Sequence, residues 1–317
     1  MRRRGLLAAG ALLPLPALGQ SFPARPVRLV VPWAPGGATS NIARIVGDAM
    51  APHLGQSVVL DHRAGAGGAI GSENVAKSPA DGYSILIAGA GTFYRPAIER
   101  DVPFDPARDF GFVGPVGDGP FALVVRNGLP DTLPGFIAAA RARPGSFNMA
   151  SSGQGSTSHL AGEAFNTAAG ITATHVPYRG AAPAMADLVG GRVDYYFDAF
   201  STVLENARAG RIGLLGVTTP VRAPQVPDVP TLIEAGLPGF SIAPWWGLVG
   251  PSGMPEAAVA RLSAALERAL AQPAVQDALG AQGCRAFFLA PGAFADYVRA
   301  EDAKWTRVID AAGLRVR

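Results

Sequence analysis

The segment V-R-L-V-V-P-W-A-P-G-G, residues 27–37, constrains the fold of this chain more than any other. Its apolar, β-branched first half predicts a buried strand that ends at Pro32. Two glycines follow the turn and precede residues 38–50, which have helical spacing. A strand that enters a helix through a glycine turn exposes free backbone N–H groups and the positive end of the helix dipole. Because this turn holds no acid, base or strong nucleophile, it predicts a site that binds an anion without reacting with it.

The first twenty residues have the pattern of a secretory signal peptide. Three arginines at positions 2–4 precede an apolar run from Leu6 to Leu18, and the sequence near Gly19 and Gln20 fits a cleavage site. The run is too short to cross a membrane, and its two prolines disfavour a buried helix. The arginines leave both Sec and twin-arginine export open. An exported chain whose single cysteine, Cys284, cannot form an internal disulfide fits a bacterial periplasm.

The charge of the mature chain excludes some classes of partner. Cleavage removes three arginines and no acid from the 27 basic and 24 acidic residues, which leaves a formal net charge of zero. No basic run remains, and this argues against a nucleic-acid partner. The four histidines are scattered without metal-ligand spacing, so neither a metal nor another cofactor is expected.

Short apolar runs alternate with amphipathic segments along the chain, the pattern of an α/β fold with parallel sheets. About 297 residues remain after cleavage, enough for two domains. The predicted strands are residues 27–31, 57–60, 83–88, 121–125, 147–151, 175–178, 193–197, 214–218 and 246–249. The predicted helices are residues 38–50, 70–77, 133–143, 159–169, 182–189, 255–279 and 291–312.

Several of these strands run into turns of small residues that open a helix. The turns are residues 36–37, 65–68, 151–156 and 178–180. In open parallel sheets such turns gather at the carboxyl ends of the strands, where ligands bind. Four of them around one cleft would line it with N–H donors and hydroxyls, which predicts a carboxylate site.

Three kinds of active or cofactor site are weaker interpretations of the same residues. The turn at 65–71 approaches a dinucleotide fingerprint, but Ile70 stands where its third glycine is required. His159 is a conceivable base for Ser152 or Ser156, yet the chain has no G-x-S-x-G elbow at these serines and no evident triad acid. Histidine spacing that would bind a metal is also missing.

Nine motifs occur in the order that is found in a known family. They are residues 25–37, 61–71, 79–86, 103–110, 149–160, 175–180, 191–198, 227–240 and 246–255. With them the chain resembles the tripartite tricarboxylate transporter receptors, the Bug group of periplasmic solute-binding proteins. Each motif alone is weak, but nine in register over nearly the whole mature chain are specific.

The resemblance implies a two-lobed α/β fold of the periplasmic-binding-protein type II class, each lobe a mostly parallel sheet flanked by helices. Lobe one would comprise residues 23–123 and 241–317, and lobe two residues 124–240, with the two crossings as a hinge. The lobes would close over a small carboxylate and deliver it to integral membrane permease subunits. The receptor would act as a monomer and would not be an enzyme.

The resemblance also implies where the carboxylate binds. One carboxylate group would be held by the Gly36-Gly37 turn with Thr39 and Ser40, often through water. The expected ligand-binding residues are Trp33, Gly36, Gly37, Ala38, Thr39, Ser40, Gly67, Gly68, Thr92, Ser152, Gly153, Ser156, Tyr178 and Asp198.

Two positions depart from the family pattern. Ser40 stands where the family often has aspartate; serine also caps helices but removes the negative charge. An amino-acid ligand that relies on that carboxylate is therefore disfavoured, and a plain dicarboxylate, or an aromatic or amide-bearing acid, is favoured. Trp33 replaces the more common Phe or Tyr, and it would narrow the cleft, stack on a flat ligand or pack under the turn.

Other roles stay open at this point. Asp198 would meet the ligand or cap the following helix, and Arg179 would pair with a distal acid of the ligand or lie on the surface. Trp245 and Trp246 are expected in the crossover or the core. Two alternative functions are an exported hydrolase, which the missing elbow disfavours, and a sensor for a membrane kinase, which would share the ligand site.

Overall fold

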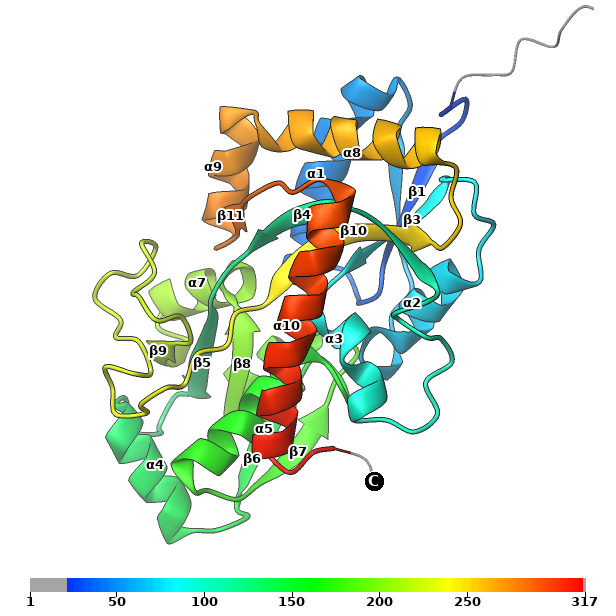
Figure 1. The fold of residues 1–317 in the computed structure, drawn as a ribbon. Helices are drawn as coiled ribbons and strands as arrows, with labels where there is room; N and C mark the ends of the chain where they lie inside the picture. Colours follow the sequence, from blue (N-terminus) through cyan, green and yellow to red (C-terminus); the bar gives the residue numbers. More distant parts are fainter. Residues whose placement is uncertain (1–21, 316–317) are drawn as a thin grey trace, which may run out of the picture.

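The computed structural model describes residues 22–315, which form two β-sheets flanked by helices (Figure 1). The predicted signal peptide lies outside the described residues. Each sheet and the helices that cover it form one lobe, so the predicted two-lobed α/β fold class is confirmed. Within residues 22–315, no helix is long and apolar enough to span a bilayer.

The first sheet has six strands, and β1 lies inside it. They are β1 (Val27–Val31), β2 (Val58–His62), β3 (Ser84–Ala88), β4 (Phe110–Asp118), β10 (Trp245–Pro251) and β11 (Arg285–Ala286), in the order β11-β4-β10-β3-β1-β2. Strand β1 pairs in parallel with β2 and β3, while β10 is antiparallel to β3 and β4. Strands β1 to β4 therefore point the same way, but β10 and β11 run against them and only two of the five strand pairs are parallel, so the sheet is mixed rather than mostly parallel.

The second sheet has five strands and repeats this arrangement. They are β5 (Phe121–Arg126), β6 (Phe147–Ser151), β7 (Ala173–Pro177), β8 (Tyr195–Ala199) and β9 (Ile212–Val217), in the order β7-β6-β8-β5-β9. Strands β6, β7 and β8 are parallel, and β5 runs antiparallel to both β8 and β9. The chain enters this sheet through β5, directly after β4, and returns to the first sheet through β10.

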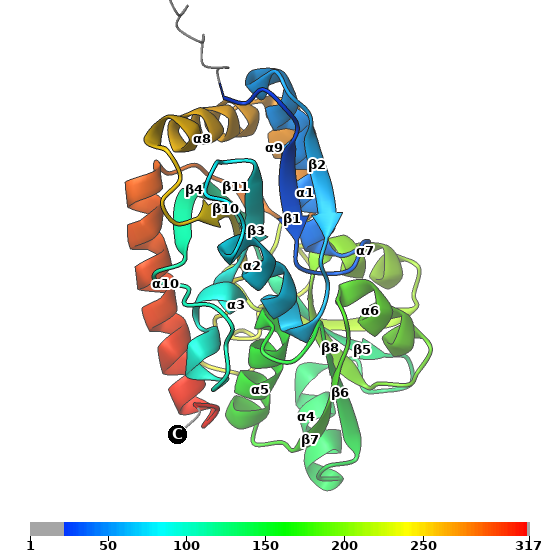
Figure 2. The ribbon, with the colours of Figure 1, turned by 90° about the vertical axis from the view of Figure 1, so that its right-hand side faces the viewer.

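The helices cover both sheets, and one of them reaches both lobes. They are α1 (Ala38–Leu54), α2 (Ala69–Ala76), α3 (Ala90–Phe93), α4 (Leu133–Ala142), α5 (Thr157–Ala169), α6 (Ala181–Val189), α7 (Phe200–Arg208), α8 (Glu256–Leu270), α9 (Pro273–Ala281) and α10 (Pro291–Ala311), with 3₁₀ turns η1 (Ala66–Gly68) and η2 (Arg95–Ala97). Helix α10, red in Figure 1, packs on β4 and α3 of the first lobe and extends to α5 of the second, as Figure 2 also shows.

All nine predicted strands are present, but β4, β11, α3 and α7 were missed, and the predicted 255–279 helix is two helices, α8 and α9. Strand β4 contains Pro115 and several glycines, which hide its strand pattern. The glycines have a packing reason: a Cβ atom at Gly117 would lie 2.4 Å from the carbonyl oxygen of Arg285, and one at Gly114 would lie 3.0 Å from Leu266. The close approach of β11 and α8 to β4 therefore requires glycine at positions 117 and 114.

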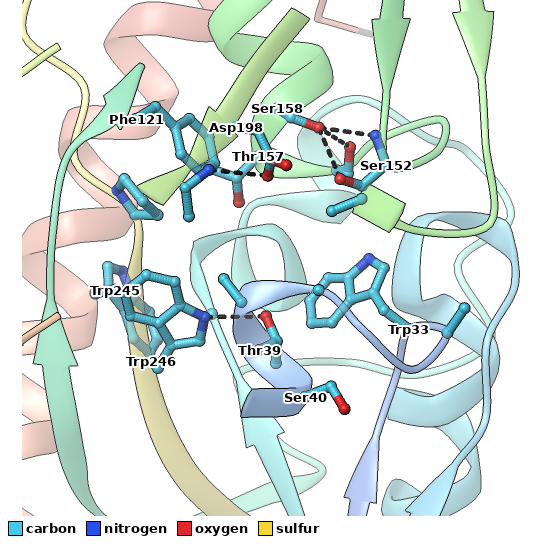
Figure 3. Close-up of a pocket in the computed structure, with 18 residues that line it drawn as sticks. Trp33, Thr39, Ser40, Phe121, Ser152, Thr157, Ser158, Asp198, Trp245 and Trp246 are labelled. Atoms are coloured by element: carbon cyan, nitrogen blue, oxygen red, sulfur yellow. Dashed lines mark hydrogen bonds between the residues drawn. The ribbon is translucent and has the colours of Figure 1, made fainter. Parts of the chain in front are cut away.

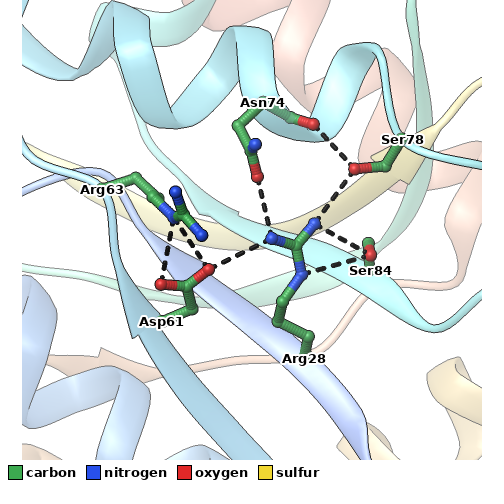
Figure 4. A network of polar contacts seen from close by, with 6 residues as sticks. All are labelled: Arg28, Asp61, Arg63, Asn74, Ser78 and Ser84. Carbon is green, nitrogen blue, oxygen red and sulfur yellow. Dashed lines mark hydrogen bonds and ion pairs between the residues drawn. The ribbon is translucent and has the colours of Figure 1, made fainter.

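An arginine whose N–H groups all donate hydrogen bonds connects α2 to the first sheet (Figure 4). Arg28 on β1 donates through Nη1 to Asp61 at 3.1 Å and Asn74 at 2.9 Å. Its Nη2 donates to Ser78 and Ser84, and its Nε also donates to Ser84. All five N–H groups of the guanidinium thus have acceptors on β2, β3, α2 and the turn after α2, a geometry that lysine cannot reproduce.

We expect Arg28→Lys to lower the free energy of unfolding by about 1–2 kcal/mol, because several acceptors in the network lose their donor. Urea unfolding followed by circular dichroism measures this loss. Arg108→Lys is the matched control, since Arg108 is exposed and lies 3.5 Å from one carboxylate. Equal stability of the two variants would contradict a structural role for the Arg28 network.

Candidate functional site

A small pocket of about 60 Å³ lies between the two lobes, at the carboxyl ends of several strands (Figure 3). Both lobes contribute to its walls, together with Pro244 and Trp245, where the chain returns from the second lobe to the first. Its lining residues are Trp33, Ala34, Gly37, Ala38, Thr39, Ser40, Gly89, Phe121, Ser152, Ser156, Thr157, Ser158, Ala181, Asp198, Ala199, Pro244, Trp245 and Trp246. The pocket therefore joins the β1–α1 turn to the turn at residues 151–156, here called the serine turn, as expected for turns at the carboxyl ends of parallel strands.

The first wall of the pocket is the start of α1, together with two tryptophans. Trp246 of β10 donates from its indole Nε1 to Thr39 Oγ1 at 3.0 Å, which leaves the Thr39 hydroxyl free to donate to a ligand. Trp33 lines the same wall and also packs against Gly68, where a Cβ atom would lie 3.2 Å from the Trp33 ring. Trp33 thus both faces the pocket and packs beside the turn.

Ser40 lies on this wall but does not cap the helix. The N-terminal cap of α1 is Gly37, and the Ser40 hydroxyl instead contacts His62 Nε2 of β2 at 2.9 Å. The prediction that Ser40 caps α1 is therefore wrong, because Ser40 is the third residue of the helix and Gly37 is the cap. Burial, with Arg44 nearby, holds the pKa of His62 below its usual value, so the imidazole is neutral at pH 7.

Helix N-termini from both lobes converge on the pocket. Helix α1 begins there after Gly37, and α5, α6 and α7 begin there after Ser156, Gly180 and Ala199. None of their first turns contains Asp or Glu, and glycine and alanine caps have no side chain that could occupy the free N–H groups. The aligned dipoles make this region positive and favour an anion.

The second wall is a hydroxyl network built on the serine turn. Ser152 Oγ contacts the Tyr196 hydroxyl at 2.7 Å and accepts from Ser158 Oγ at 3.2 Å, while Ser158 Oγ lies 3.1 Å from Ser156 Oγ. Ser156 also caps α5 through the N–H of His159. This network fixes the serine hydroxyls, which present both donors and acceptors to the pocket.

Asp198 lies at the end of β8 and lines the pocket while nearly fully buried. It does not cap α7, whose N-terminal cap is Ala199 without a side-chain bond: one carboxyl oxygen accepts from the N–H of Ala199 at 2.8 Å and the other from the Thr202 hydroxyl. Burial raises the pKa of Asp198 to about 7, although these hydrogen bonds oppose the rise. No basic side chain within residues 22–315 forms an ion pair with Asp198.

Two indole donors next to the pocket have no hydrogen-bond partner among residues 22–315. Trp33 Nε1 and Trp245 Nε1 are buried, and neither donates a hydrogen bond to any group in the described part of the chain. A buried donor without an acceptor costs about 1–3 kcal/mol. An anionic ligand is a natural acceptor for such groups, so both atoms are candidate contacts in addition to the helix N–H groups.

Eight of the predicted binding residues line the pocket, and six do not. The eight are Trp33, Gly37, Ala38, Thr39, Ser40, Ser152, Ser156 and Asp198; the six are Gly36, Gly67, Gly68, Thr92, Gly153 and Tyr178. Gly36, with φ +91°, and Gly37 allow α6 to approach, since Cβ atoms there would lie 3.4 and 3.3 Å from Ala182 and Ala181.

The other four predicted glycine and threonine residues outside the pocket lie in three places. Gly67 and Gly153 meet each other across the lobes, and a Cβ atom at Gly153 would lie 2.9 Å from Gly67 Cα. Gly68 lies behind Trp33. Thr92 is buried inside α3, one turn beyond the pocket residue Gly89.

Tyr178, the tyrosine among the predicted binding residues, does not line the pocket. The Tyr178 hydroxyl donates to Asp187 at 2.8 Å, and burial together with this carboxylate raises its pKa to about 12. The Arg179 side chain is exposed and only its backbone carbonyl contacts the other lobe, where it accepts from Ala34 at 3.3 Å. The surface alternative for Arg179 is therefore the observed one.

Several lining residues were missed by the sequence interpretation, although most follow signals that it contains. Gly89 and Ala199 stand at the carboxyl ends of β3 and β8, and Thr157 and Ser158 continue the serine turn. Phe121, Pro244, Trp245 and Trp246 lie on the crossings, and only the fold brings them to the pocket.

His159 is not placed as a general base for Ser152 or Ser156. His159 Nδ1 accepts from the N–H of Gly155 at 3.2 Å, and its ring stacks on His175 at 3.9 Å. His175 contacts Ser151, which is fully buried and outside the pocket, rather than Ser152 or Ser156. Burial lowers the pKa of His159 to about 3, so it is a poor general base. The described residues contain no cluster of His, Cys, Asp or Glu that could hold a metal.

The chain matches one protein family over most of its length. A profile described as tripartite tricarboxylate transporter family receptor matches residues 42–314. The UPF0065 protein in the tcbD-tcbE intergenic region of Pseudomonas sp. strain P51 is 42% identical, with 91% of this chain and 87% of that protein covered. Protein BugT of Bordetella pertussis is 34% identical, with 99% and 97% covered.

Solved structures agree with this match. The periplasmic binding protein BugD superposes with a TM-score of 0.90 at 33% identity, with 93% of this chain and 100% of that chain covered. Rpa4515 of R. palustris, solved with adipate, has a TM-score of 0.89 at 36% identity, with 92% and 98% covered. MatC of Rhodopseudomonas palustris, with bound malate, has a TM-score of 0.86 at 35% identity, with 91% and 100% covered. On sequence and fold together, the chain belongs to the tripartite tricarboxylate transporter receptor family, the Bug group of periplasmic solute-binding proteins.

Proposed function

We propose that this receptor captures a small dicarboxylate in the pocket between its lobes and delivers it to the membrane subunits of a tripartite transporter. The observation that carries the proposal is the convergence of helix N-termini on a pocket without any basic side chain among its described lining residues. Backbone N–H groups and helix dipoles bind carboxylates without catalysing a reaction. The proposal therefore includes no enzymatic activity.

Two relatives support the dicarboxylate class. Structures of Rpa4515 with adipate and of MatC with malate share the fold of this chain at 36% and 35% identity. Both of these molecules carry two carboxylates on an aliphatic chain. The pocket here has polar groups on both walls, which suits a ligand with an anionic group at each end.

Ser40 supports a plain dicarboxylate over an amino acid. Its hydroxyl is engaged with a neutral His62, so the first wall has no negative charge that would bind an ammonium group. Trp33 and Trp246 add flat apolar surface beside this wall, against which a short methylene chain would pack.

Capture would proceed by closure of the two lobes about the crossings. The chain leaves the first sheet after Asp118 and enters the second at Phe121, and it returns to the first at Trp245. We place the hinge at residues 119–120 and 241–244, close to the boundaries that the sequence predicts. The export signal at residues 1–20 would bring the receptor to the periplasm, where the permease subunits can be reached.

Thermal-shift screening followed by isothermal titration calorimetry tests the proposed ligand class. We expect succinate, malate or adipate to raise the melting temperature, since a ligand at 100 times its Kd adds about 2.7 kcal/mol to the stability of the folded state. Aspartate and glutamate, with acetate as the single-carboxylate control, should give little shift. Stabilisation by the amino acids and not by the plain dicarboxylates would contradict the proposal.

A further inference from the structure

Asp198 presents an electrostatic conflict with the proposed ligand. It is the one acidic or basic side chain among the described residues that line the pocket, and it is about 4% exposed. A dicarboxylate in this small volume would lie beside it, and two like charges in a buried site repel strongly. One of the two groups must therefore be neutral when the pocket is filled.

Within the described part of the chain, no basic side chain pairs with Asp198 to hold it ionised. Ala122 of β5 is its partner in the strand pairing, and Thr202 of α7 is bonded to it. The groups that share the pocket with it include Phe121, Ser152, Ser158, Thr39, Pro244 and Trp245, and Tyr196 of β8 bonds Ser152 beside them. Tyr196 is the titratable member of this set, and burial keeps its pKa well above 10, so it stays neutral.

The other buried aspartate of this lobe shows the contrast. Asp194 is also nearly buried, but its carboxylate accepts from Arg126 Nε at 2.8 Å and from the N–H of Asn148 at 2.7 Å. Asp198 has one backbone N–H and one hydroxyl instead. Both of these bonds survive protonation, because a protonated carboxyl oxygen keeps a lone pair with which it can accept.

We infer that Asp198 takes up a proton from solvent when a dicarboxylate binds, and that its acid form then donates a hydrogen bond to a ligand carboxylate. This inference rests on the proposed function and adds that capture is linked to pH. The proton comes from bulk water and returns to it on release, so no other reactant is required. Asp198 thus acts as a specificity residue that accepts an acid by changing its own charge.

The direction of the pH effect follows from the position of the group. Burial already places the pKa of Asp198 at about 7 before the ligand enters, and a neighbouring anion raises it further. Below about pH 6 the carboxyl is protonated in advance, so binding takes up almost no proton. At about pH 8 it is ionised in the free protein, so each binding event takes up about one proton and affinity falls as pH rises.

Isothermal titration calorimetry in two buffers of different ionisation enthalpy measures this proton number directly. With malate or adipate as probe, we expect about one proton per ligand at about pH 8 and fewer than about 0.2 at about pH 6. Asp198→Asn should bind without proton uptake and about tenfold more tightly than the natural protein at about pH 8. Asp187→Asn, which removes an acid of the same lobe outside the pocket, should keep the natural proton number.

Each outcome decides the inference. Binding of malate or adipate without proton uptake by the natural protein overturns it and leaves the proposed function intact. Uptake that persists in Asp198→Asn overturns it as well, because the proton would then reside on the ligand. If none of the dicarboxylates binds at either pH, the proposed ligand class and the inference are both wrong. The measurement on the natural protein needs no variant, so a folding defect in Asp198→Asn does not affect it.

Discussion

Gly67→Ala is expected to weaken dicarboxylate binding by about 100-fold or more while the two lobes stay folded, which corresponds to at least about 2.7 kcal/mol. A Cβ atom at Gly67 would lie 1.9 Å from the carbonyl oxygen of Gln154 in the other lobe, a distance that no relaxation of a side chain can relieve. The Gly67 carbonyl is also fixed by Nη2 of the buried Arg95 at 2.5 Å. The added methyl group should therefore hold the cleft open.

Calorimetry gives the loss of affinity, and small-angle X-ray scattering with and without malate shows whether the lobes close. Gly55→Ala is the matched control: Gly55 also has a left-handed backbone, with φ +73° against +56° at Gly67, but a Cβ atom there meets nothing within 4 Å. Both variants should lose a similar small amount of stability. Unimpaired closure of Gly67→Ala would show that this contact does not define the closed state.

Phe165→Ala is expected to lower the free energy of unfolding by about 3–5 kcal/mol, a large share of the 5–15 kcal/mol typical of a folded protein. Phe165 on α5 is fully buried. The centre of its ring lies 5.4 Å from that of Phe197 and 6.0 Å from that of Tyr195. Rings of Phe136 and Phe240 complete the cluster at 6.3 and 6.4 Å. Alanine would leave a cavity that these rigid rings cannot fill.

Urea unfolding of Phe165→Ala and Phe165→Leu separates the loss of volume from the loss of the ring. Leucine should restore most of the stability, because it fills much of the cavity. Val221→Ala is the surface control, since Val221 is 73% exposed and its truncation should change stability by less than about 0.5 kcal/mol. A loss below about 1 kcal/mol in Phe165→Ala would indicate that the aromatic cluster repacks.

The strand–turn–helix units were predictable from sequence because each depends on neighbouring residues. The apolar run of β1, the two glycines after it and the periodic residues of α1 occur in one stretch, and the same holds for the serine turn and α5. Since parallel strands end at the same edge of a sheet, the convergence of these turns followed from the pattern alone. The eight predicted residues that line the pocket come mostly from such turns.

Contacts that join distant segments were not predictable in this way. Ser40 has the residue type of a helix cap, and only the pairing of β1 with β2 brings His62 to its hydroxyl. Trp246 reaches Thr39 across 207 positions of sequence, since β10 returns from the second lobe beside β3. Gly67 and Gly153 have the residue type of ligand-contacting turns, but the same lack of a side chain serves lobe contact.

The distribution of helix N-termini between the lobes has a consequence for release. Helix α1 belongs to the first lobe, and α5, α6 and α7 belong to the second. Their dipoles overlap at the pocket only when the lobes are together, and a dipole acts mainly within one helical turn. Opening the hinge would divide this positive region into two weaker halves. Separation of the lobes would therefore lower the affinity for the anion by itself, without a competing ligand.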